Sequence, residues 1–231
     1  MHAIVELECR TWIGGLELLT ENAENTKVVI APRCLGLKLD FGSGDNPKIG
    51  FDGVDLFASK AKWRQNLFTF PWPWGDEQVA EIHCSHFIEH IPMTYVTNDV
   101  EFSEVPTSEN SMDLFLKFFE ECYRILTPGG KMTCIWPNNK SDRAFQDPTH
   151  RRFIPPMFVA YLNRNWRNSN GLGHYLGSCN FTDGNNGLSV VTPLFPPPDF
   201  ALFSEEAAQR RMMENWNTFL DYQAVLIKQK D

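Results

Sequence analysis

The hydrophobic positions of this chain follow two periods, and one segment shows the helical period clearly. Between residues 111 and 126, apolar side chains recur every three or four positions, as on a helix with one buried face. Asn110 suits the cap of this helix, Asp113 suits its first turn, and Thr-Pro-Gly-Gly at 127–130 ends it. An apolar strand at 131–136 follows at once. A helix that leads through Pro-Gly-Gly into such a strand is an αβ unit, so we expect a mostly parallel sheet.

Short apolar runs bounded by turn residues predict the other strands, and two further segments predict helices. The expected strands are 35–41, 51–56, 79–85, 188–193 and 222–228, and the expected helices are 156–163 and 205–215. Pro71 and Pro73 make residues 66–74 an extended loop. A strand at the end of an α/β chain often adds antiparallel to the sheet edge, and we expect this of the last strand.

The composition is typical of a folded domain. Of the 231 residues, 42% are hydrophobic and 13% aromatic, and a chain of this length buries enough surface to fold without disulfides or a structural metal. With 21 cationic and 29 anionic side chains, the net charge of −8 disfavours a generic nucleic-acid binder, which is normally basic. We therefore expect a single α/β domain over residues 1–231.

The cysteines and the apolar runs indicate a cellular compartment. None of the six cysteines forms a CxxC pair, so neither a zinc site nor a redox motif is indicated. No apolar run approaches the roughly 18 residues of a membrane span. The first residues carry acids where a secretory signal carries cations. These features predict a reduced, soluble protein of the cytoplasm.

Charge is unevenly distributed along the chain. Residues 76–113 carry nine acids and no Lys or Arg, whereas residues 140–167 carry six cations against Asp142 and Asp147. Two solvated faces would explain this pattern, and such faces are the usual meaning of charge runs. Alternatively, the basic segment contacts an anionic substrate.

The candidate chemistry begins with the glycines of residues 42–44, which follow an expected strand. Such a loop lets a ligand approach the backbone, and Asp55, at the end of the next strand, can accept hydrogen bonds from two ribose hydroxyls. A dinucleotide fingerprint would place a third glycine where Pro47 stands, and its ribose acid about 20 residues on. Asp40 and Asp45 flank the loop, and carboxylates suit a sulfonium better than a pyrophosphate. The loop therefore favours S-adenosylmethionine (SAM) over NAD.

Four segments together resemble the motifs of class I SAM-dependent methyltransferases. They are residues 37–56 with the glycine loop, 70–74, 81–90 and 123–130, in the family's order, and they cover roughly residues 35–136. The resemblance implies a doubly wound, mostly parallel seven-stranded sheet with helices on both faces and an antiparallel last strand. It also implies a cofactor-binding half at about 35–136, and a substrate-side insertion with C-terminal strands at about 137–231.

The same resemblance implies a set of SAM contacts at the carboxyl ends of the strands. The implied residues are Asp40, Gly42, Ser43, Gly44, Asp55, Leu56, Asn66, Leu67, Ser85 and His86. Asp55 would bind the ribose, and Asn66 with Leu67 would lie near the adenine. The family often has an acid at the position of Asn66, but an asparagine can still accept a hydrogen bond with its carbonyl oxygen.

The histidines offer both metal and proton chemistry. His83, His86 and His90 have the spacing H-x2-H-x3-H, but a strand followed by a turn would point them in different directions, so no metal site is predicted. His150 is the candidate general base, with Asp147 and His90 as further candidates. A turn that merely caps the next segment, and a structural or cleft-lining role for His90, are the competing interpretations.

The sequence thus predicts a SAM-dependent methyltransferase whose acceptor is unidentified. We expect a small molecule, and an anionic one would be met by Arg151 or Arg152. Sugars, lipids, proteins and nucleic acids remain open, because fold cannot decide among acceptors. The alternatives are a nucleotide-dependent oxidoreductase on the same kind of sheet and a catalytically silent SAM-binding protein.

Overall fold

The computed structural model describes residues 10–13, 16–19, 36–96, 102–103, 112–174 and 179–229. The chain divides into two compact units, Met1–Leu35 and Gly36–Asp231. In the first unit, β1 (Arg10–Ile13) and β2 (Leu16–Leu19) form an antiparallel pair that the sequence patterns did not predict.

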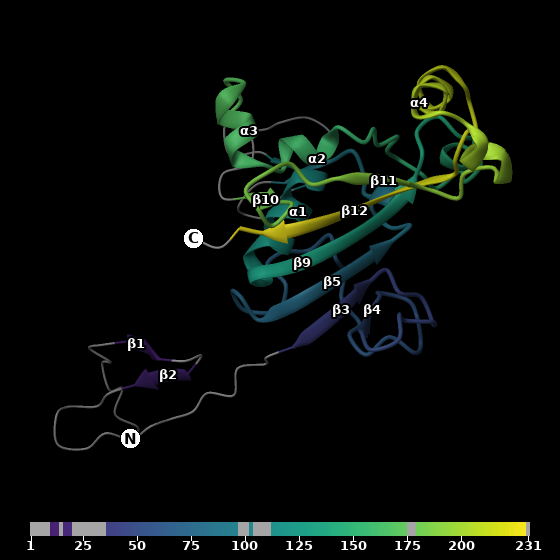
Figure 1. The fold of residues 1–231 in the computed structure, drawn as a ribbon. Coiled ribbons are helices and arrows are strands. Elements are labelled where there is room, and N and C mark those ends of the chain that lie inside the picture. Colours follow the sequence, from purple (N-terminus) through teal and green to yellow (C-terminus); the bar gives the residue numbers. More distant parts are fainter. Residues whose placement is uncertain are drawn as a thin grey trace, which may run out of the picture. The chain divides into compact units, whose positions relative to one another are not determined.

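A seven-stranded sheet forms the centre of the second unit (Figure 1). Its strands are β3 (Leu37–Phe41), β4 (Asp52–Val54), β5 (Val79–Ser85), β9 (Leu126–Pro137), β10 (Phe181–Thr182), β11 (Val191–Leu194) and β12 (Asp221–Lys228). They are ordered β10-β12-β9-β5-β3-β4, and β11 also pairs with β12. The pairs from β4 to β9 are parallel, and β12 is antiparallel to β9, β10 and β11. Every strand of this sheet except β12 therefore points the same way, which confirms the predicted sheet with its antiparallel last strand.

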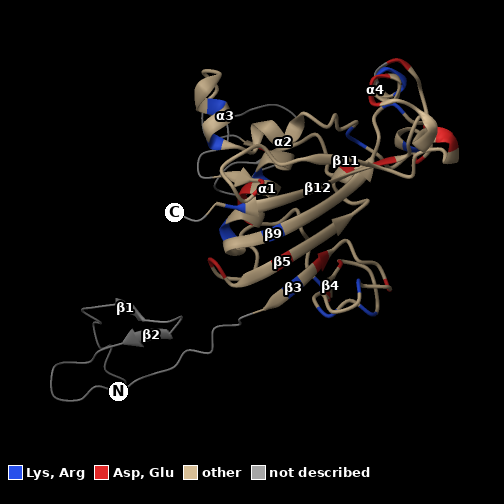
Figure 2. Cartoon of the chain, viewed as in Figure 1, with Lys and Arg blue, Asp and Glu red and all other residues tan. Residues whose placement is uncertain are grey.

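Helices and short strands connect the strands of the sheet. The α-helices are α1 (Leu114–Ile125), α2 (Phe158–Tyr161), α3 (Arg164–Ser169) and α4 (Glu205–Glu214), and the 3-10 turns are η1 (Ile88–His90), η2 (Asp142–Ala144) and η3 (Pro198–Leu202). A small second sheet contains β6 (Tyr95–Val96), β7 (Phe102–Ser103) and β8 (Met112–Asp113). The helix α4 carries two acids in its first turn, followed by two arginines and a final acid (Figure 2).

Several boundaries differ from the predicted ones. The helix predicted at 111–126 starts at Leu114, because the Asp113 side chain accepts a hydrogen bond from the Phe115 N–H and caps it. Asn110, the predicted cap, lies outside the described residues. Residues 127–130 lie inside β9, where they bulge out between the pairs Val79–Leu126 and Glu81–Lys131. The helix predicted at 156–163 shortens to four residues, and α3 was not predicted.

One face of the sheet carries the hydrophobic core. Along it, buried apolar residues from β3, β5 and β9 stand side by side, for example Phe41, Cys84 and Cys134. The rings of Trp72 and Trp74, in the loop between β4 and β5, lie 5.0 and 5.8 Å from that of Phe41. This loop and α1 both pack against the hydrophobic face of the sheet.

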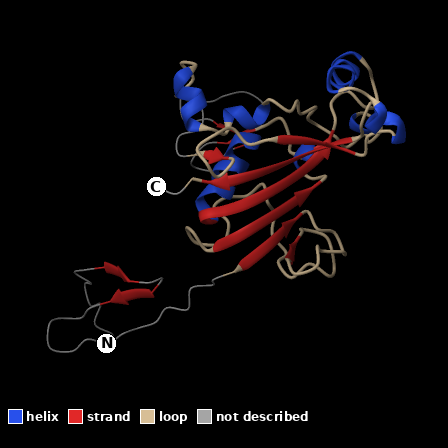
Figure 3. Cartoon of the chain, viewed as in Figure 1, coloured by secondary structure: helices blue, strands red, loops and turns tan. Residues whose placement is uncertain are grey.

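The opposite face of the sheet is polar over β3 and β5. Lys38, Glu81 and Lys131 lie in one cross-strand row, with Nζ to carboxylate distances of 2.6 and 3.3 Å. The two lysine side chains are 40% and 50% exposed, and no helix lies in front of β3, β5 and β9 in Figure 3. The connections at residues 42–51 and 55–78 are loops rather than helices. Within the described residues, no helix covers this face at β3, β5 and β9, whereas the resemblance implied helices on both faces.

Two further features bear on the predicted compartment. Four of the cysteines are free and buried, namely Cys84, Cys122, Cys134 and Cys179. The other two lie outside the described residues. In the part of the chain that the structure describes, no helix combines the length and apolarity needed to cross a lipid bilayer.

Candidate active site

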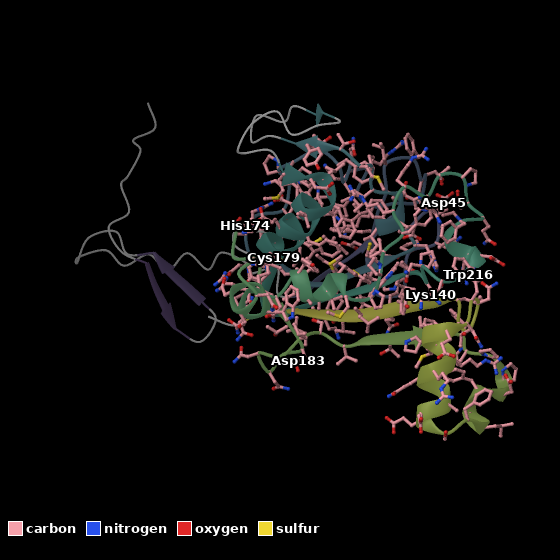
Figure 4. All side chains as sticks on the ribbon, turned by 90° about the horizontal axis from the view of Figure 1, so that it is seen from above. Asp45, Lys140, His174, Cys179, Asp183 and Trp216 are labelled. Atoms are coloured by element: carbon pink, nitrogen blue, oxygen red, sulfur yellow. The ribbon has the colours of Figure 1, made fainter. Side chains whose placement is uncertain are left out.

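Most of the predicted site residues lie at the carboxyl edge of the parallel strands. Residues 42–51 follow β3, Asp55 follows β4, His86 follows β5, and residues 138–150 follow β9. Figure 4 places Asp45 and Lys140, from the loops after β3 and β9, toward the same end of the second unit, and His174 at the other end. The sheet therefore brings distant segments together at one edge, where open α/β sheets bind ligands.

The two glycines of the loop have different surroundings. Gly42 has a φ of +67° and Gly44 a φ of +56°, a region that favours glycine. A β-carbon on Gly42 would lie 2.5 Å from Cδ2 of Phe87, whereas one on Gly44 would have no atom within 4 Å. Gly42 is therefore needed for packing, and Gly44 borders open space. Between them, the Ser43 hydroxyl donates to the Gly44 carbonyl at 3.0 Å.

Asp55 holds the glycine loop through backbone hydrogen bonds. Its Oδ2 accepts from the Gly44 N–H at 3.1 Å, and its Oδ1 accepts from the Phe57 and Ala58 N–H groups at 2.8 and 2.9 Å. Partial burial opposes ionisation, but the three N–H groups outweigh it and lower the pKa of Asp55 below its ordinary value. Two carboxylate oxygens offer about four acceptor positions, so about one, on Oδ2, remains for a ligand hydroxyl. In this conformation, Asp55 has room for one ribose hydrogen bond rather than two.

The other predicted cofactor contacts are less available. Asp40 is 5% exposed, and it pairs with the His83 ring and accepts from the Lys48 N–H, both at 2.7 Å. Asn66 uses its side-chain oxygen to accept from the Phe68 N–H at 2.9 Å. Leu67 lies in the core at 4% exposure, whereas Leu56 is 39% exposed. Of these four, Leu56 is the most accessible to a ligand.

A second group of charged residues begins directly after β5. His86 has a φ of +53°, and its ring lies 3.2 Å from a Glu89 oxygen and 3.6 Å from an Asp221 oxygen. Both carboxylates are almost fully buried, at 1% and 0% exposure. Their interactions with the ring, that of Asp221 first, raise the pKa of His86 to about 9, although burial opposes this. Arg143 also contacts Asp221, at 3.1 Å.

The three residues predicted as catalytic lie together beside this group. The rings of His90 and His150 are 4.8 Å apart between centroids. Thr149 bridges His90 and Asp147, with its hydroxyl 3.1 Å from His90 Nδ1 and 2.7 Å from the Asp147 carboxylate to which it donates. His150 directs Nδ1 to the Ala144 carbonyl at 2.8 Å, so its Nε2 faces Glu89 and Asp147, at 4.0 and 3.9 Å.

The two arginines proposed to meet the acceptor differ in their contacts. Arg152 donates to the Ile91 and Pro92 carbonyls at 2.9 and 2.6 Å, and pairs with Asp113 at 3.0 Å. The latter contact joins the basic segment to the acidic one, so at Arg152 the two charged segments pair with each other. Arg151 is exposed, and its guanidinium donates to the Pro148 carbonyl at 3.1 Å.

The sequence patterns missed several members of this site. Asp221, Arg143 and Glu89 were not among the predicted site residues. The direction of the last strand could have identified Asp221, because an antiparallel strand begins where its parallel neighbours end. His83 faces the polar side of the sheet with Asp40, so it does not join His86 and His90 around one point.

Comparison with known proteins supports the fold. No protein-family model and no curated protein matches the sequence. Among solved structures, the chain is similar to a SAM-dependent methyltransferase from Archaeoglobus fulgidus, at 16% identity over 84% of this chain and 86% of that one, with a TM-score of 0.50. A SAM-dependent methyltransferase from Thermotoga maritima matches at 13% identity over 84% and 83%, and its TM-score of 0.44 adds no argument. Similarity at this identity concerns the fold alone, and the chain has the class I SAM-dependent methyltransferase fold.

Proposed function

We propose that this protein is an enzyme that binds SAM beside the glycine loop and transfers its methyl group to an acceptor at the same edge of the sheet. The observation that carries the proposal is the pairing of Gly44, which borders open space, with an ionised Asp55 that keeps one acceptor position. A nucleoside cofactor needs both a backbone that it can approach and an acceptor for a ribose hydroxyl. The residues present therefore fit such a group.

The charge at the loop favours SAM over a dinucleotide. Asp45 is exposed, and the Lys60 N–H donates to its carboxylate at 2.9 Å. This hydrogen bond, with smaller ones from Ser59, lowers the pKa of Asp45 below its ordinary value, so the carboxylate is ionised at neutral pH. A negative charge next to Gly44 repels a pyrophosphate and attracts a sulfonium.

When bound, SAM supplies a methyl group on a sulfonium whose leaving group is a neutral thioether. The chain then has to position the acceptor and remove its proton if the nucleophile is an oxygen or nitrogen. The carbonyl of Ala144 only accepts hydrogen bonds, so His150 carries its proton on Nδ1 and its Nε2 is free to take another. Hydrogen bonds from Thr149 lower the pKa of Asp147, which makes that carboxylate a weaker base than an ordinary aspartate.

The proposed acceptor is a small molecule, with anionic compounds among the candidates. Arg151 supports this choice because it is exposed near Asp147 and His150, whereas Arg152 is occupied by its contacts with carbonyls and with Asp113. The proposed location is the cytoplasm, which the four free cysteines of the described residues support.

Thermal unfolding with SAM, its demethylated product and NAD tests the cofactor. A ligand at 100 times its Kd stabilises the folded state by about 2.7 kcal/mol, which corresponds to roughly 5–10 °C for a chain of this size. Stabilisation by SAM and its product, but not by NAD, is the expected result. Stabilisation by NAD alone would favour the oxidoreductase instead.

Turnover separates an enzyme from a silent SAM-binding protein. A metabolite screen with methyl-labelled SAM is expected to transfer label to at least one small acceptor. Binding of SAM without transfer to small molecules or macromolecules would favour the silent alternative.

A further inference from the structure

Three side chains next to the proposed acceptor site are arranged as ligands for a metal ion. Glu89, His90 and His150 each offer one ligand atom, and these atoms lie within 4.8 Å of one another. Glu89 and His90 belong to η1, and His150 belongs to the loop after β9. Backbone hydrogen bonds from Arg151 and Arg152 to the Glu89 carbonyl, at 2.8 and 3.1 Å, hold the two segments together.

Glu89 provides the independent reason to expect a cation. Its side chain is 2% exposed, and neither carboxylate oxygen has a well-aligned hydrogen-bond donor. The His86 ring at 3.2 Å is shared with Asp221 and faces only one of the two oxygens. Buried carboxylates are normally paired, hydrogen-bonded or bound to a metal, and beyond the His86 contact on one oxygen the second oxygen of Glu89 lacks such a partner.

The contacts of the two histidines orient them as metal ligands. Thr149 donates its single hydroxyl proton to Asp147, so it must accept from His90, which places the His90 proton on Nδ1 and leaves Nε2 with a lone pair. His150 likewise donates from Nδ1 to the Ala144 carbonyl and turns Nε2 toward Glu89. Histidine ligands in metal sites are held by a hydrogen bond that the other ring nitrogen donates, most often to a carboxylate, carbonyl or water, and here to a carbonyl and a hydroxyl.

From these observations we propose that Glu89, His90 and His150 bind one divalent transition-metal ion. Two imidazoles and one carboxylate suit Zn²⁺, Fe²⁺ or Mn²⁺, whereas Mg²⁺ and Ca²⁺ prefer all-oxygen sites. Ligand atoms around a tetrahedral ion are about 3.4 Å apart, so the most distant of these ligand atoms have to approach one another by roughly 1 Å. Three protein ligands leave a position for water or for an oxygen of the acceptor.

This site differs from the H-x2-H-x3-H spacing seen in the sequence, and metal binding to it does not require SAM. A metal ion would occupy the lone pairs of His90 and His150, so neither residue would then be the general base of the proposed methyl transfer. Asp147 lies beside the site, and its exposed carboxylate adds negative charge that favours a cation.

Titration of the metal-free full chain with Co²⁺ tests the site. We expect one equivalent to bind saturably, with visible absorption typical of mixed nitrogen and oxygen ligation, and Zn²⁺ to displace it. Glu89→Gln, His90→Ala and His150→Ala should each weaken binding at least tenfold. His174→Ala is the matched control, because this exposed histidine lies at the other end of the second unit (Figure 4), and it should bind Co²⁺ as wild type does.

Thr149→Val separates a ligand site from incidental metal binding. It keeps all three ligands and removes the oxygen that orients His90, so it should weaken Co²⁺ binding roughly 10–100-fold. Far-UV circular dichroism and metal-free melting verify that each variant is folded. If Glu89→Gln does not fold, the Co²⁺ affinities of His90→Ala and His150→Ala test the proposal.

Absence of saturable Co²⁺ binding in the wild type, or unchanged affinity in both histidine variants, overturns the proposal. Because Co²⁺ binding is measured without SAM, and SAM binding without metal, failure of either proposal is visible separately.

Discussion

Replacing Gly42 or Gly44 by alanine adds the same methyl group at two positions that differ in what surrounds them. Both residues have positive φ, so each alanine costs about 1–2 kcal/mol of backbone strain. At Gly42 the new β-carbon would also lie 2.5 Å from the Phe87 ring. That ring stacks on Phe68 and packs on Phe118, so it cannot retreat freely.

Overpacking of this kind costs about 1–3 kcal/mol, which brings the expected loss for Gly42→Ala to about 2–5 kcal/mol. Gly44→Ala should lose only the strain. At about 2–4 °C per kcal/mol, the two melting temperatures should differ by roughly 2–12 °C. Urea unfolding followed by tryptophan fluorescence gives both free energies of unfolding.

Ligand binding should reverse the order of the two variants. The methyl group of Gly44→Ala points into the open space that the proposed cofactor would occupy, so SAM binding should fall at least tenfold in calorimetry. Gly42→Ala should bind SAM more nearly as wild type does at temperatures where it is folded. Equal destabilisation in both variants would refute the packing argument, and normal SAM binding by Gly44→Ala would refute the cofactor site.

The remaining predictions concern the loop anchor, the aromatic loop and the arginines. Asp55→Asn should destabilise the fold by about 1–3 kcal/mol in urea unfolding, because an amide cannot accept from all three backbone N–H groups. Since folding lowers the pKa of Asp55, the stability that the ionised carboxylate contributes is complete above its ordinary pKa of 3.8 and is lost as the pH falls further. A difference in stability between wild type and Asp55→Asn that persists in strong acid would contradict this. Glu121→Ala should cost about 3–5 kcal/mol, because this buried carboxylate binds a loop N–H and an arginine, whereas Arg210→Ala, which breaks an exposed pair, should cost less than about 0.5 kcal/mol. With an anionic acceptor, Arg151→Ala should lower kcat/KM and leave SAM affinity intact, and the loss of kcat/KM should be smaller for a neutral analogue of the acceptor. Arg152→Ala should instead lower the melting temperature, because Arg152 holds carbonyls and Asp113. A lower melting temperature for Arg151→Ala and a lower kcat/KM for Arg152→Ala would exchange the two roles.

Much of the sheet could be predicted because its signals are local. β5 is a seven-residue strand whose bounds match the prediction, and α1 shows the 3.6-residue period over most of its length. Their order along the chain, with Pro-Gly-Gly between α1 and the body of β9, indicated a parallel pair. The bulge at residues 127–130 has no such signal, since it depends on the register with β5.

Within the described residues, the lengths of the connections explain why no helix covers the face of β3 and β5 that carries Lys38 and Glu81. Helices on both faces came from the resemblance and not from the residues between the strands. Only residues 42–51 separate β3 from β4, and a crossover that includes a helix needs about a dozen residues or more. The longer link at 55–78 is rich in Trp, Phe and Pro, which packs as a loop against the core face. The lengths of these two connections therefore account for the absence of helices from them in the described structure.

The candidate site was predictable only where it follows the parallel strands. Glycines, Asp55 and His86 stand directly after strands, so topology alone brings them to one edge. Glu89 carries no such signal: its burial without a hydrogen-bond donor results from η1 packing under the loop after β9. Tertiary packing of this kind leaves no periodic trace in the sequence.

The reversed direction of β12 decides which charge reaches the site. Asp221 pairs with Pro137, the last residue of β9, so the amino end of β12 lies at the carboxyl edge of its neighbour. If β12 ran parallel, its other end, with Lys228, would lie there instead. Lys228 lies at the far edge, 3.3 Å from Glu77. Because Asp221 is fully buried, it requires cations nearby, and His86 and Arg143 supply them. The antiparallel last strand thus places a buried carboxylate, and the two cations paired with it, beside Glu89 at the edge where the proposed acceptor binds.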